Sequence, residues 1–509
     1  AVERCCESTA KGTKEHEDRT ANGRESDRRQ ESGARIQPEA SHSPLPLVPS
    51  LEGCPKGGVG FSAIRNPNSE ISHSLPMLAP TVSFKTVGCR LNQAETALMR
   101  AAFLDAGYRM AARGEAADVC VVHGCVVTAK AEQNSLRLAR AARRRPGGMV
   151  VLAGCPVSAG TCAVRAAVSA DLLADQVGKF RLPQLLASRG FPAPAASPRP
   201  MLPVFETTRA IVKIQDGCSF GCAYCIVPRA RGPSVSRPLA DIVAEVGGLV
   251  RAGFREIVLT GANIGCYADG GRMLVDLLDA LETVPGLERL RLSSIEPSTV
   301  ERAVLERLAR SAILCRHLHL PLQSGSDRIL RAMGRRYTAR DYESFLETAC
   351  ARVEGLSLGA DVIAGFPGET DADFEATLAL IERHPFANLH VFSYSRRPGT
   401  LAATLPDPVA PVEKKARAEK LMLLAQRKRE AFARSWLGRP VSVLVERLAP
   451  DGTAGGWTRE YLWTEIRGRP ESAGRPGGGD ACVSLQRNDI VSVTPSSVRG
   501  ETLAAVVER

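Results

Sequence analysis

Hydrophobic and polar residues begin to alternate with regular periods near Thr81, after a long polar start. Three short apolar runs predict buried strands, namely residues 81–88 (TVSFKTVG), 117–124 (ADVCVVHG) and 149–155 (MVVLAGC). The segments between them, residues 91–107 and 128–145, carry apolar residues at helical spacing. Strands that alternate with helices across short turns predict a parallel α/β sheet.

A second series of strands and helices begins after a proline-rich stretch that predicts a linker. Six runs predict its strands: 210–215 (AIVKIQ), 255–261 (REIVLTG), 289–295 (RLRLSSI), 317–322 (HLHLPL), 357–365 (SLGADVIAG) and 388–394 (NLHVFSY). Helical patterns follow the first five of them. Such units predict a (β/α)6 partial TIM barrel, whose active site would lie at the carboxyl ends of its strands.

The tail begins with a long basic helical pattern at residues 410–438. Short β-like runs at 441–448, 461–466 and 489–495 then predict a small OB-like β-barrel, with a flexible loop at 468–479. The predicted fold class is therefore α/β with three folded parts. The predicted boundaries are 1–80 for a disordered extension, 81–190 for the N-terminal domain, 191–206 for the linker, 207–437 for the barrel and its basic helix, and 438–509 for the β module.

Composition and charge restrict the partner, the compartment and the use of cysteine that we expect for this protein. Lys and Arg number 66 against 55 for Asp and Glu, a net charge of +11 with a pI near 9.1, which favours a polyanionic partner such as nucleic acid over a merely basic surface. No apolar run reaches the length of a membrane span, and the polar start predicts a cytoplasmic protein. In a reducing compartment, the 15 cysteines favour metal ligation over disulfides.

Three cysteines follow the first predicted barrel strand within the stretch GCSFGCAYC. Cys218, Cys222 and Cys225 have the spacing CxxxCxxC. Three thiolates can hold three irons of a [4Fe–4S] cluster and leave the fourth iron open, whereas structural zinc wants four ligands. A redox CxxC would open a helix and would lack the third cysteine. The pattern is typical of radical S-adenosylmethionine (SAM) enzymes, in which the open iron binds SAM.

A second set of cysteines lies in the N-terminal domain. Cys89, Cys125 and Cys155 each follow a predicted strand and each has glycine directly before it. Because the carboxyl ends of parallel strands meet at one edge of a sheet, these three thiols are expected to come together there. A lone Gly-Cys pair would instead indicate an ordinary core cysteine.

Two tri-cysteine sets and a C-terminal β module together resemble the methylthiotransferase family, from about residue 81 to the end. The resemblance implies two [4Fe–4S] clusters: an auxiliary one that supplies or carries sulfur, and one that generates the 5′-deoxyadenosyl radical. It implies SAM as radical source and methyl donor, and an RNA-binding TRAM domain at the C-terminus. It requires no catalytic side chain beyond the cluster ligands.

Further motifs resemble the tRNA-modifying members. The motifs that carry this resemblance are residues 317–338 (HLHLPLQSGSDRILRAMGRRYT) and 361–370 (DVIAGFPGET). The branch that acts on a ribosomal-protein aspartate typically has histidine at the position of Ser324. KTVGCRLNQAET and LHVFSYSRRPGT resemble the subgroup that acts on N6-threonylcarbamoyladenosine beside the anticodon; the isopentenyladenosine subgroup usually shows a GCQMN-like motif. Arg229 departs from the family, which has tyrosine there.

The remaining candidate residues follow from their places near the strand ends. By the resemblance, the SAM-binding candidates are Tyr224, Gly261, Asn263, Gln323 and Asp361. A purely steric reason for Gly261 is equally open, and Glu296 could bind either SAM or substrate. The candidates for substrate binding near the catalytic-face loops are Arg229, Arg231, Arg335 and Arg336.

The predicted function is a tRNA methylthiotransferase that acts on C2 of N6-threonylcarbamoyladenosine in the anticodon loop. Its expected partners are tRNA, a sulfur source, and an electron donor such as flavodoxin or ferredoxin, with no membrane. The alternatives are the same chemistry on isopentenyladenosine or on a ribosomal-protein aspartate. A non-catalytic RNA-binding metalloprotein is an alternative from another class, and it would not cleave SAM.

Overall fold

The computed structural model describes residues 79–112, 114–144, 147–160, 170–191, 202–467 and 485–506. Three sequence predictions lie wholly or largely outside this part of the chain. They concern the extension at 1–80, most of the linker at 191–206, and the loop at 468–479.

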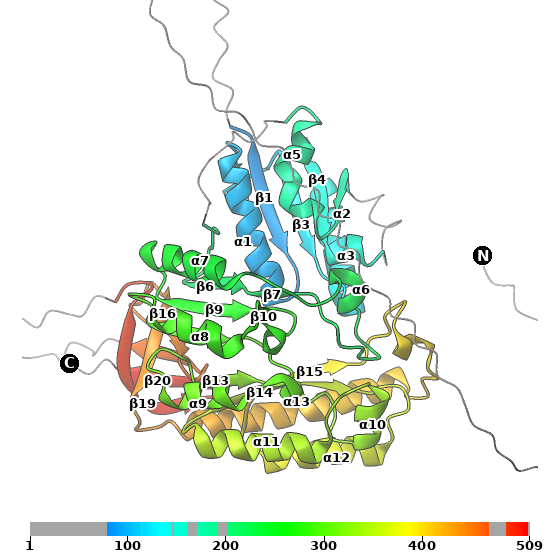
Figure 1. The fold of residues 1–509 in the computed structure, drawn as a ribbon, viewed down its shortest axis with the longest axis vertical. Coiled ribbons are helices and arrows are strands. Elements are labelled where there is room, and N and C mark those ends of the chain that lie inside the picture. The colour runs from blue at the N-terminus through cyan, green and yellow to red at the C-terminus, as the bar shows by residue number, and fades with distance from the viewer. Residues whose placement is uncertain are drawn as a thin grey trace, which may run out of the picture. The chain divides into compact units, whose positions relative to one another are not determined.

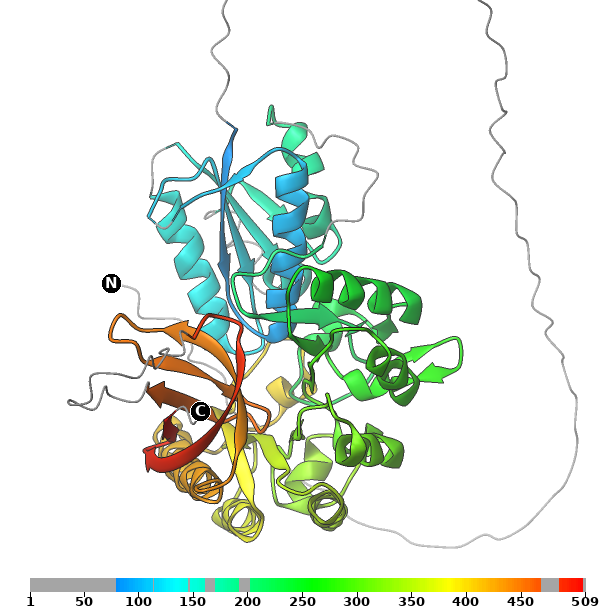
Figure 2. The same cartoon turned by 90° about the vertical axis from the view of Figure 1, so that its left-hand side faces the viewer.

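The N-terminal domain is a parallel sheet with helices on both faces, as the alternating pattern predicts (Figures 1 and 2). Its strand order is β2-β1-β3-β4-β5, and each neighbouring pair is parallel. The strands are β1 (Thr81–Thr86), β2 (Arg109–Met110), β3 (Val119–Gly124), β4 (Met149–Gly154) and β5 (Leu172–Ala174). The helices are α1 (Arg90–Asp105), α2 (Ala129–Arg143), α3 (Cys155–Ser158) and α5 (Leu182–Ala187).

The alternating direction of the side chains along β3 explains why helices cover both faces of this sheet. Val119 and Val121 belong to the apolar core that contains α1 and α5, whereas Val122 belongs to the core that contains α2. Successive strand residues point to opposite faces, so a strand that is apolar at nearly every position needs a helix on each side. The ends of β1, β3 and β4 are thereby placed side by side at one edge.

The second domain has six parallel strands in two linked sheets, which confirms the partial barrel. The sheet orders are β12-β9-β6 and β13-β14-β15, and a parallel bridge from Ser294 to His319 joins them. The strands are β6 (Arg209–Lys213), β9 (Glu256–Thr260), β12 (Arg289–Leu292), β13 (His317–His319), β14 (Ser357–Ala364) and β15 (Phe386–Ser393). Helices α7 (Leu239–Arg251), α8 (Leu274–Glu282), α9 (Arg302–Arg310), α11 (Ala339–Arg352) and α12 (Asp371–Arg383) lie between strands in the chain.

Strand β13 is shorter than the predicted run 317–322. Pro321 has no N–H to donate to a neighbouring strand, and Gln323 adopts a left-handed backbone with φ of 66°. Regular strand pairing therefore ends at His319, and the chain pairs with β14 again only at Gln323, which forms an isolated parallel bridge with Val362.

The basic helix and the C-terminal barrel complete the described chain. Helix α13 (Pro411–Arg434) packs along β15. Five strands then close a barrel in the order β16-β17-β18-β20-β19, which confirms the predicted β-barrel. They are β16 (Val441–Leu448), β17 (Ala454–Thr458), β18 (Trp463–Arg467), β19 (Ile490–Arg499) and β20 (Thr502–Val506). None of the described helices combines the length and the apolar character needed to cross a membrane.

Candidate cluster sites and barrel lumen

The loop with Cys218, Cys222 and Cys225 lies directly after β6 and the short strand β7 (Gln215–Asp216). Gly217 begins it with φ of +65°, and a Cβ there would lie 1.9 Å from the carbonyl oxygen of Pro233, so this position needs glycine. The backbone N–H of Ala223 donates to the Met333 carbonyl at 2.8 Å. The loop is thus held from both sides before any ligand binds.

The thiols of this loop suit a cluster better than a single ion. The three sulfur atoms do not all lie within 4.8 Å of one another, as the ligands of a single ion would. In a [4Fe–4S] cluster each thiolate binds a different iron, which requires this wider spacing. Burial raises the pKa of Cys225 to about 12, so its proton must leave when metal binds.

Arg335 lies beside this loop instead of facing solvent. Its side chain is 4% exposed and pairs with Glu296 at 2.6 Å. Its Nη1 lies 3.6 Å from the Cys222 sulfur and 3.4 Å from the Tyr224 hydroxyl. Arg335, which the sequence predicts to bind substrate, has its guanidinium buried between Glu296 and the Cys222 sulfur.

Gly261 and Asn263 support the same loop from the end of β9. A Cβ at Gly261 would lie 2.7 Å from Oε1 of Gln215, which is the steric reason left open by the sequence. Gln215 accepts from the Asn263 backbone N–H at 3.0 Å and donates to the Gly217 carbonyl at 2.7 Å. Contact of Gly261 and Asn263 with SAM stays a prediction.

The structure places Cys89, Cys125 and Cys155 after β1, β3 and β4, which are neighbouring strands. Cys89 is exposed, and the other two are buried. A Cβ at Gly88 would lie 2.7 Å from the Cβ of Cys125, so the glycine before one cysteine makes room for another. Burial, together with smaller contributions from the neighbouring thiols Cys89 and Cys155, raises the pKa of Cys125 to about 12.

Asn92, within the motif GCRLN, ties two of these cysteine loops together. Its Nδ2 donates to the carbonyl of Val87, after β1, at 2.8 Å and to that of Gly124, at the end of β3, at 2.9 Å. Its Oδ1 accepts from Arg231 Nη2 at 2.6 Å. The sequence motif by itself does not reveal this bridging role of Asn92, although its position three residues after Cys89 indicates a place beside that cysteine.

Arg231, which the sequence predicts to bind substrate, is part of a buried charge network. Its side chain is 3% exposed, and it pairs with Glu95 of α1 at 2.9 Å. Lys179 and Lys213 also pair with Glu95, at 2.7 and 3.1 Å. The network joins the N-terminal domain to the barrel, and no single-sequence pattern indicates it because its members lie far apart in the chain.

We expect Glu95→Gln to lower the free energy of unfolding by about 3 kcal/mol at pH 7, because it leaves buried cations without their shared anion. Burial alone raises the pKa of Glu95, but Lys179 and Arg231 bring it well below its ordinary value. The stabilisation is therefore present above the ordinary carboxyl pKa and is lost as the pH falls toward the folded value. Denaturant titration of both proteins at pH 7 and pH 3 measures this difference, which should shrink at pH 3.

The matched control for this prediction is Glu347→Gln on the exposed face of α11. An equal effect of the two substitutions at pH 7 would show that the buried network contributes nothing specific.

The two cysteine loops meet at an apolar contact between the domains. Cys155 packs in one buried cluster with Ile226 and Ala230, and Ile226 directly follows Cys225. Val126, which follows Cys125, belongs to the same cluster. Helix α3 therefore contacts α6 (Val227–Arg231), so that the predicted auxiliary ligands adjoin the predicted radical-SAM ligands.

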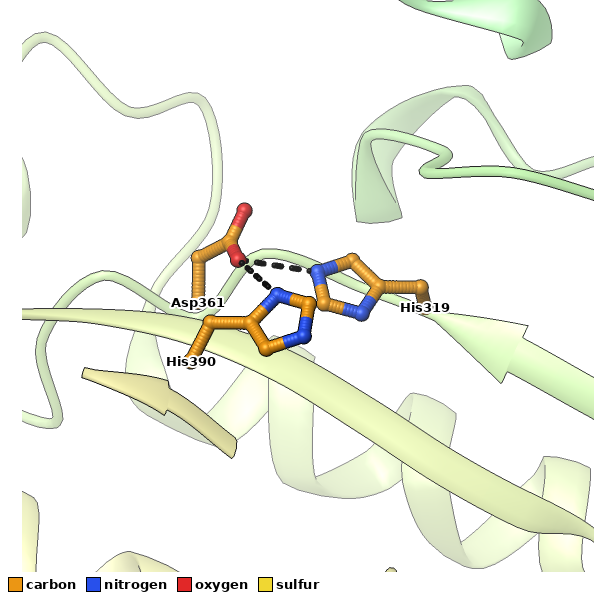
Figure 3. Close-up of side chains that lie close together, drawn as sticks. All are labelled: His319, Asp361 and His390. Atoms are coloured by element: carbon orange, nitrogen blue, oxygen red, sulfur yellow. Dashed lines mark hydrogen bonds and ion pairs between the residues drawn. The ribbon is translucent and has the colours of Figure 1, made fainter. Parts of the chain in front are cut away.

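The remaining predicted residues lie at the mouth and inside the barrel. Arg336 is exposed, with its guanidinium 4.3 Å from the ring centre of Phe220 in the cysteine loop. Arg229 is exposed beside Gly399. Gln323 is buried, and its Oε1 has no hydrogen-bond partner within the described residues. Asp361 contacts two histidines in the lumen (Figure 3).

Family models match both α/β domains of the chain. Residues 212–381 match the Radical SAM superfamily, and residues 81–175 match Uncharacterized protein family UPF0004. A solved structure of the radical S-adenosylmethionine methyltransferase TsrM from Kitasatospora setae has a TM-score of 0.48 at 16% identity, covering 64% of this chain and 77% of that one. The fold and the match to the superfamily define a radical-SAM protein, and the cofactors of that domain are a [4Fe–4S] cluster and SAM.

Two relatives identify the family. Threonylcarbamoyladenosine tRNA methylthiotransferase MtaB of Bacillus subtilis (strain 168) is 33% identical over 415 residues, which cover 78% of this chain and 92% of that protein. The tRNA-2-methylthio-N(6)-dimethylallyladenosine synthase of Cereibacter sphaeroides is 35% identical over 437 residues, which cover 83% and 98%. This chain belongs to the radical-SAM methylthiotransferase family.

Proposed function

We propose that the protein is a tRNA methylthiotransferase that places a methylthio group on C2 of N6-threonylcarbamoyladenosine beside the anticodon. The observation that carries the proposal is the contact between the two cysteine loops through Cys155 and Ile226. A reaction that activates a carbon at one centre and adds sulfur from another needs both centres beside one substrate.

Each cysteine set has a separate task in this proposal. Cys218, Cys222 and Cys225 would hold the cluster that binds SAM, while Cys89, Cys125 and Cys155 would hold an auxiliary cluster. When bound, the two clusters and SAM supply the radical that removes hydrogen from C2, the sulfur and the methyl group. Tyr224 and Arg335 pack around the first loop, and Asn92 holds the second together.

RNA is the substrate that the whole chain supports. The net charge of +11 favours a polyanion, and both relatives described above are named as tRNA-modifying enzymes. We propose the domain division 81–190, 207–437 and 438–509, with the C-terminal barrel as an RNA-binding module. An electron donor and a sulfur source would complete the reaction in a cytoplasmic setting.

Dimethylallyladenosine (isopentenyladenosine) in tRNA is a second candidate substrate. The Cereibacter relative named for that product is similar to this chain at 35% identity, as close as the Bacillus relative at 33%. The motifs KTVGCRLNQAET and LHVFSYSRRPGT support the threonylcarbamoyl substrate instead.

Deletion of the gene should remove 2-methylthio-threonylcarbamoyladenosine from total tRNA and leave its unthiolated precursor to accumulate. Mass spectrometry of nucleosides from the deletion strain, the parent and a complemented strain measures both species. If methylthio-isopentenyladenosine falls instead, the second candidate replaces the first. If neither nucleoside changes, tRNA is not the substrate.

A further inference from the structure

Three polar side chains meet in the lumen of the barrel. They are His319 on β13, Asp361 on β14 and His390 on β15, three adjacent strands. The apolar residues that flank them pack with the surrounding helices, so the triad points to the opposite face (Figure 3). Asp361 Oδ1 lies 3.0 Å from Nε2 of His319 and 3.2 Å from Nδ1 of His390.

Hydrogen bonds behind His390 determine where its proton lies. Nη1 of Arg429, on α13, donates to Oδ1 of Asn388 at 2.8 Å. A guanidinium cannot accept, so the amide NH2 of Asn388 faces Nε2 of His390, at 3.2 Å. Nε2 therefore accepts, and the neutral ring carries its proton on Nδ1, which donates to Asp361.

This arrangement opposes a metal ion, although the three ligand atoms lie within 4.8 Å of one another. A metal bound to Nδ1 of His390 would move the ring proton to Nε2, against the amide protons of Asn388. Reversing the amide would turn its NH2 group toward the Arg429 guanidinium, which also only donates.

The triad instead presents a hydrogen-bond acceptor. Both histidines contact Oδ1, and the second carboxylate oxygen points away from both rings (Figure 3). Burial alone raises the pKa of Asp361, but the two imidazoles hold it well below its usual value, so the group stays ionised. Its side chain is 24% exposed, and that of His390 is 52% exposed, so a ligand in the lumen can reach them.

We propose that the His319–Asp361–His390 triad is a recognition subsite for hydrogen-bond donors on the N6 substituent of the target adenosine. The threonylcarbamoyl group carries an N–H and a hydroxyl, whereas dimethylallyl carries neither. The carboxylate of the threonylcarbamoyl group has to lie away from the triad, because ionised Asp361 would repel it. An apolar group would strip water from the carboxylate without replacing its hydrogen bonds, so the subsite selects the polar substituent. This inference rests on the proposed function, and it assigns Asp361 to the substrate in place of the SAM contact that the sequence predicts.

The test measures binding rather than turnover. The full-length protein with its clusters loaded is titrated, without reductant, with anticodon stem–loop RNA that carries either threonylcarbamoyl- or isopentenyladenosine. Wild type should bind the threonylcarbamoyl RNA more tightly. His390→Phe removes one of the two imidazoles that orient the Asp361 carboxylate and keep it ionised, and it should lower this preference about tenfold while SAM affinity stays unchanged.

Two further variants sharpen the result. His384→Phe makes the same substitution at the end of α12, where His384 pairs with Glu343 outside the lumen, and should keep the preference. Asn388→Asp presents an acceptor to Nε2 of His390, moves the ring proton away from Asp361, and should reproduce the loss.

Several outcomes would overturn the inference. A preference for threonylcarbamoyl RNA that survives His390→Phe and Asn388→Asp would remove the subsite but leave the proposed function intact. A tenfold loss of SAM affinity in His390→Phe would assign the triad to the cofactor. A metal other than iron, bound at one per chain and lost in His390→Phe, would make it a metal site. A wild-type preference for isopentenyl RNA would overturn the proposed substrate first, and the subsite with it.

Discussion

Replacing Cys222 with alanine should abolish reductive cleavage of SAM, with 5′-deoxyadenosine falling to the level of an enzyme-free sample. Three thiolates hold three irons of a [4Fe–4S] cluster and leave the fourth open for SAM. The loss of one thiolate leaves a second iron without its protein ligand and destabilises the cluster. The loop keeps its shape without Cys222, because Gly217 and the contact from Ala223 to Met333 do not involve its sulfur. The effect should therefore be on the cluster and not on folding.

Anaerobic assay of 5′-deoxyadenosine with a chemical reductant measures this result after identical cluster reconstitution of both proteins. Cys350→Ala, a half-buried thiol on α11, is the matched control and should cleave SAM as wild type does. Cleavage retained in Cys222→Ala would show that this loop does not hold the SAM-binding cluster.

Replacing Cys125 with alanine should have the opposite profile, with SAM cleavage within about twofold of wild type and no methylthio product. Cys125 lies at the end of β3 in the N-terminal domain, and its neighbours are Gly88 and the other two thiols of that set. The substitution Cys125→Ala should therefore remove the sulfur-supplying centre and leave the SAM-binding loop intact.

Parallel measurement of 5′-deoxyadenosine and of the modified nucleoside in a tRNA substrate distinguishes the two effects. Cys120→Ala, on β3 itself, controls for the loss of a thiol from the same strand. Equal loss of cleavage in Cys125→Ala and Cys222→Ala would contradict the separate tasks of the two cysteine sets.

Several residues that are not themselves predicted ligands surround the two cysteine sets. Arg335 lies beside Cys222, and Asn92 links the loops of Cys89 and Cys125. Arg231 and Glu95 form the buried ion pair between the domains. Substitutions at these positions would alter the setting of a cluster without removing a ligand, so they should produce partial losses rather than complete ones.

The order of strands and helices was predictable from the sequence because local periodicity sets it. The runs at 81–88, 117–124 and 149–155 form the parallel strands β1, β3 and β4, and six predicted runs form the barrel. Less regular elements were harder to find. Strand β17, with the sequence AGGWT, lacks a strong strand pattern, and its place depends on pairing with β16 and β18.

The candidates for chemistry could be identified from local patterns, because the CxxxCxxC spacing and the three Gly-Cys pairs can be recognised without a fold. The surroundings of these cysteines become visible only in the folded chain. Arg231 and Arg335, which are close to the cysteines in the sequence or the predicted loops, are buried partners of Glu95 and Glu296, and His319, Asp361 and His390 come together from three strands. The reason is physical: a side chain's charge partners and burial depend on residues distant in the chain, which only the packing of strands and domains brings within hydrogen-bonding distance.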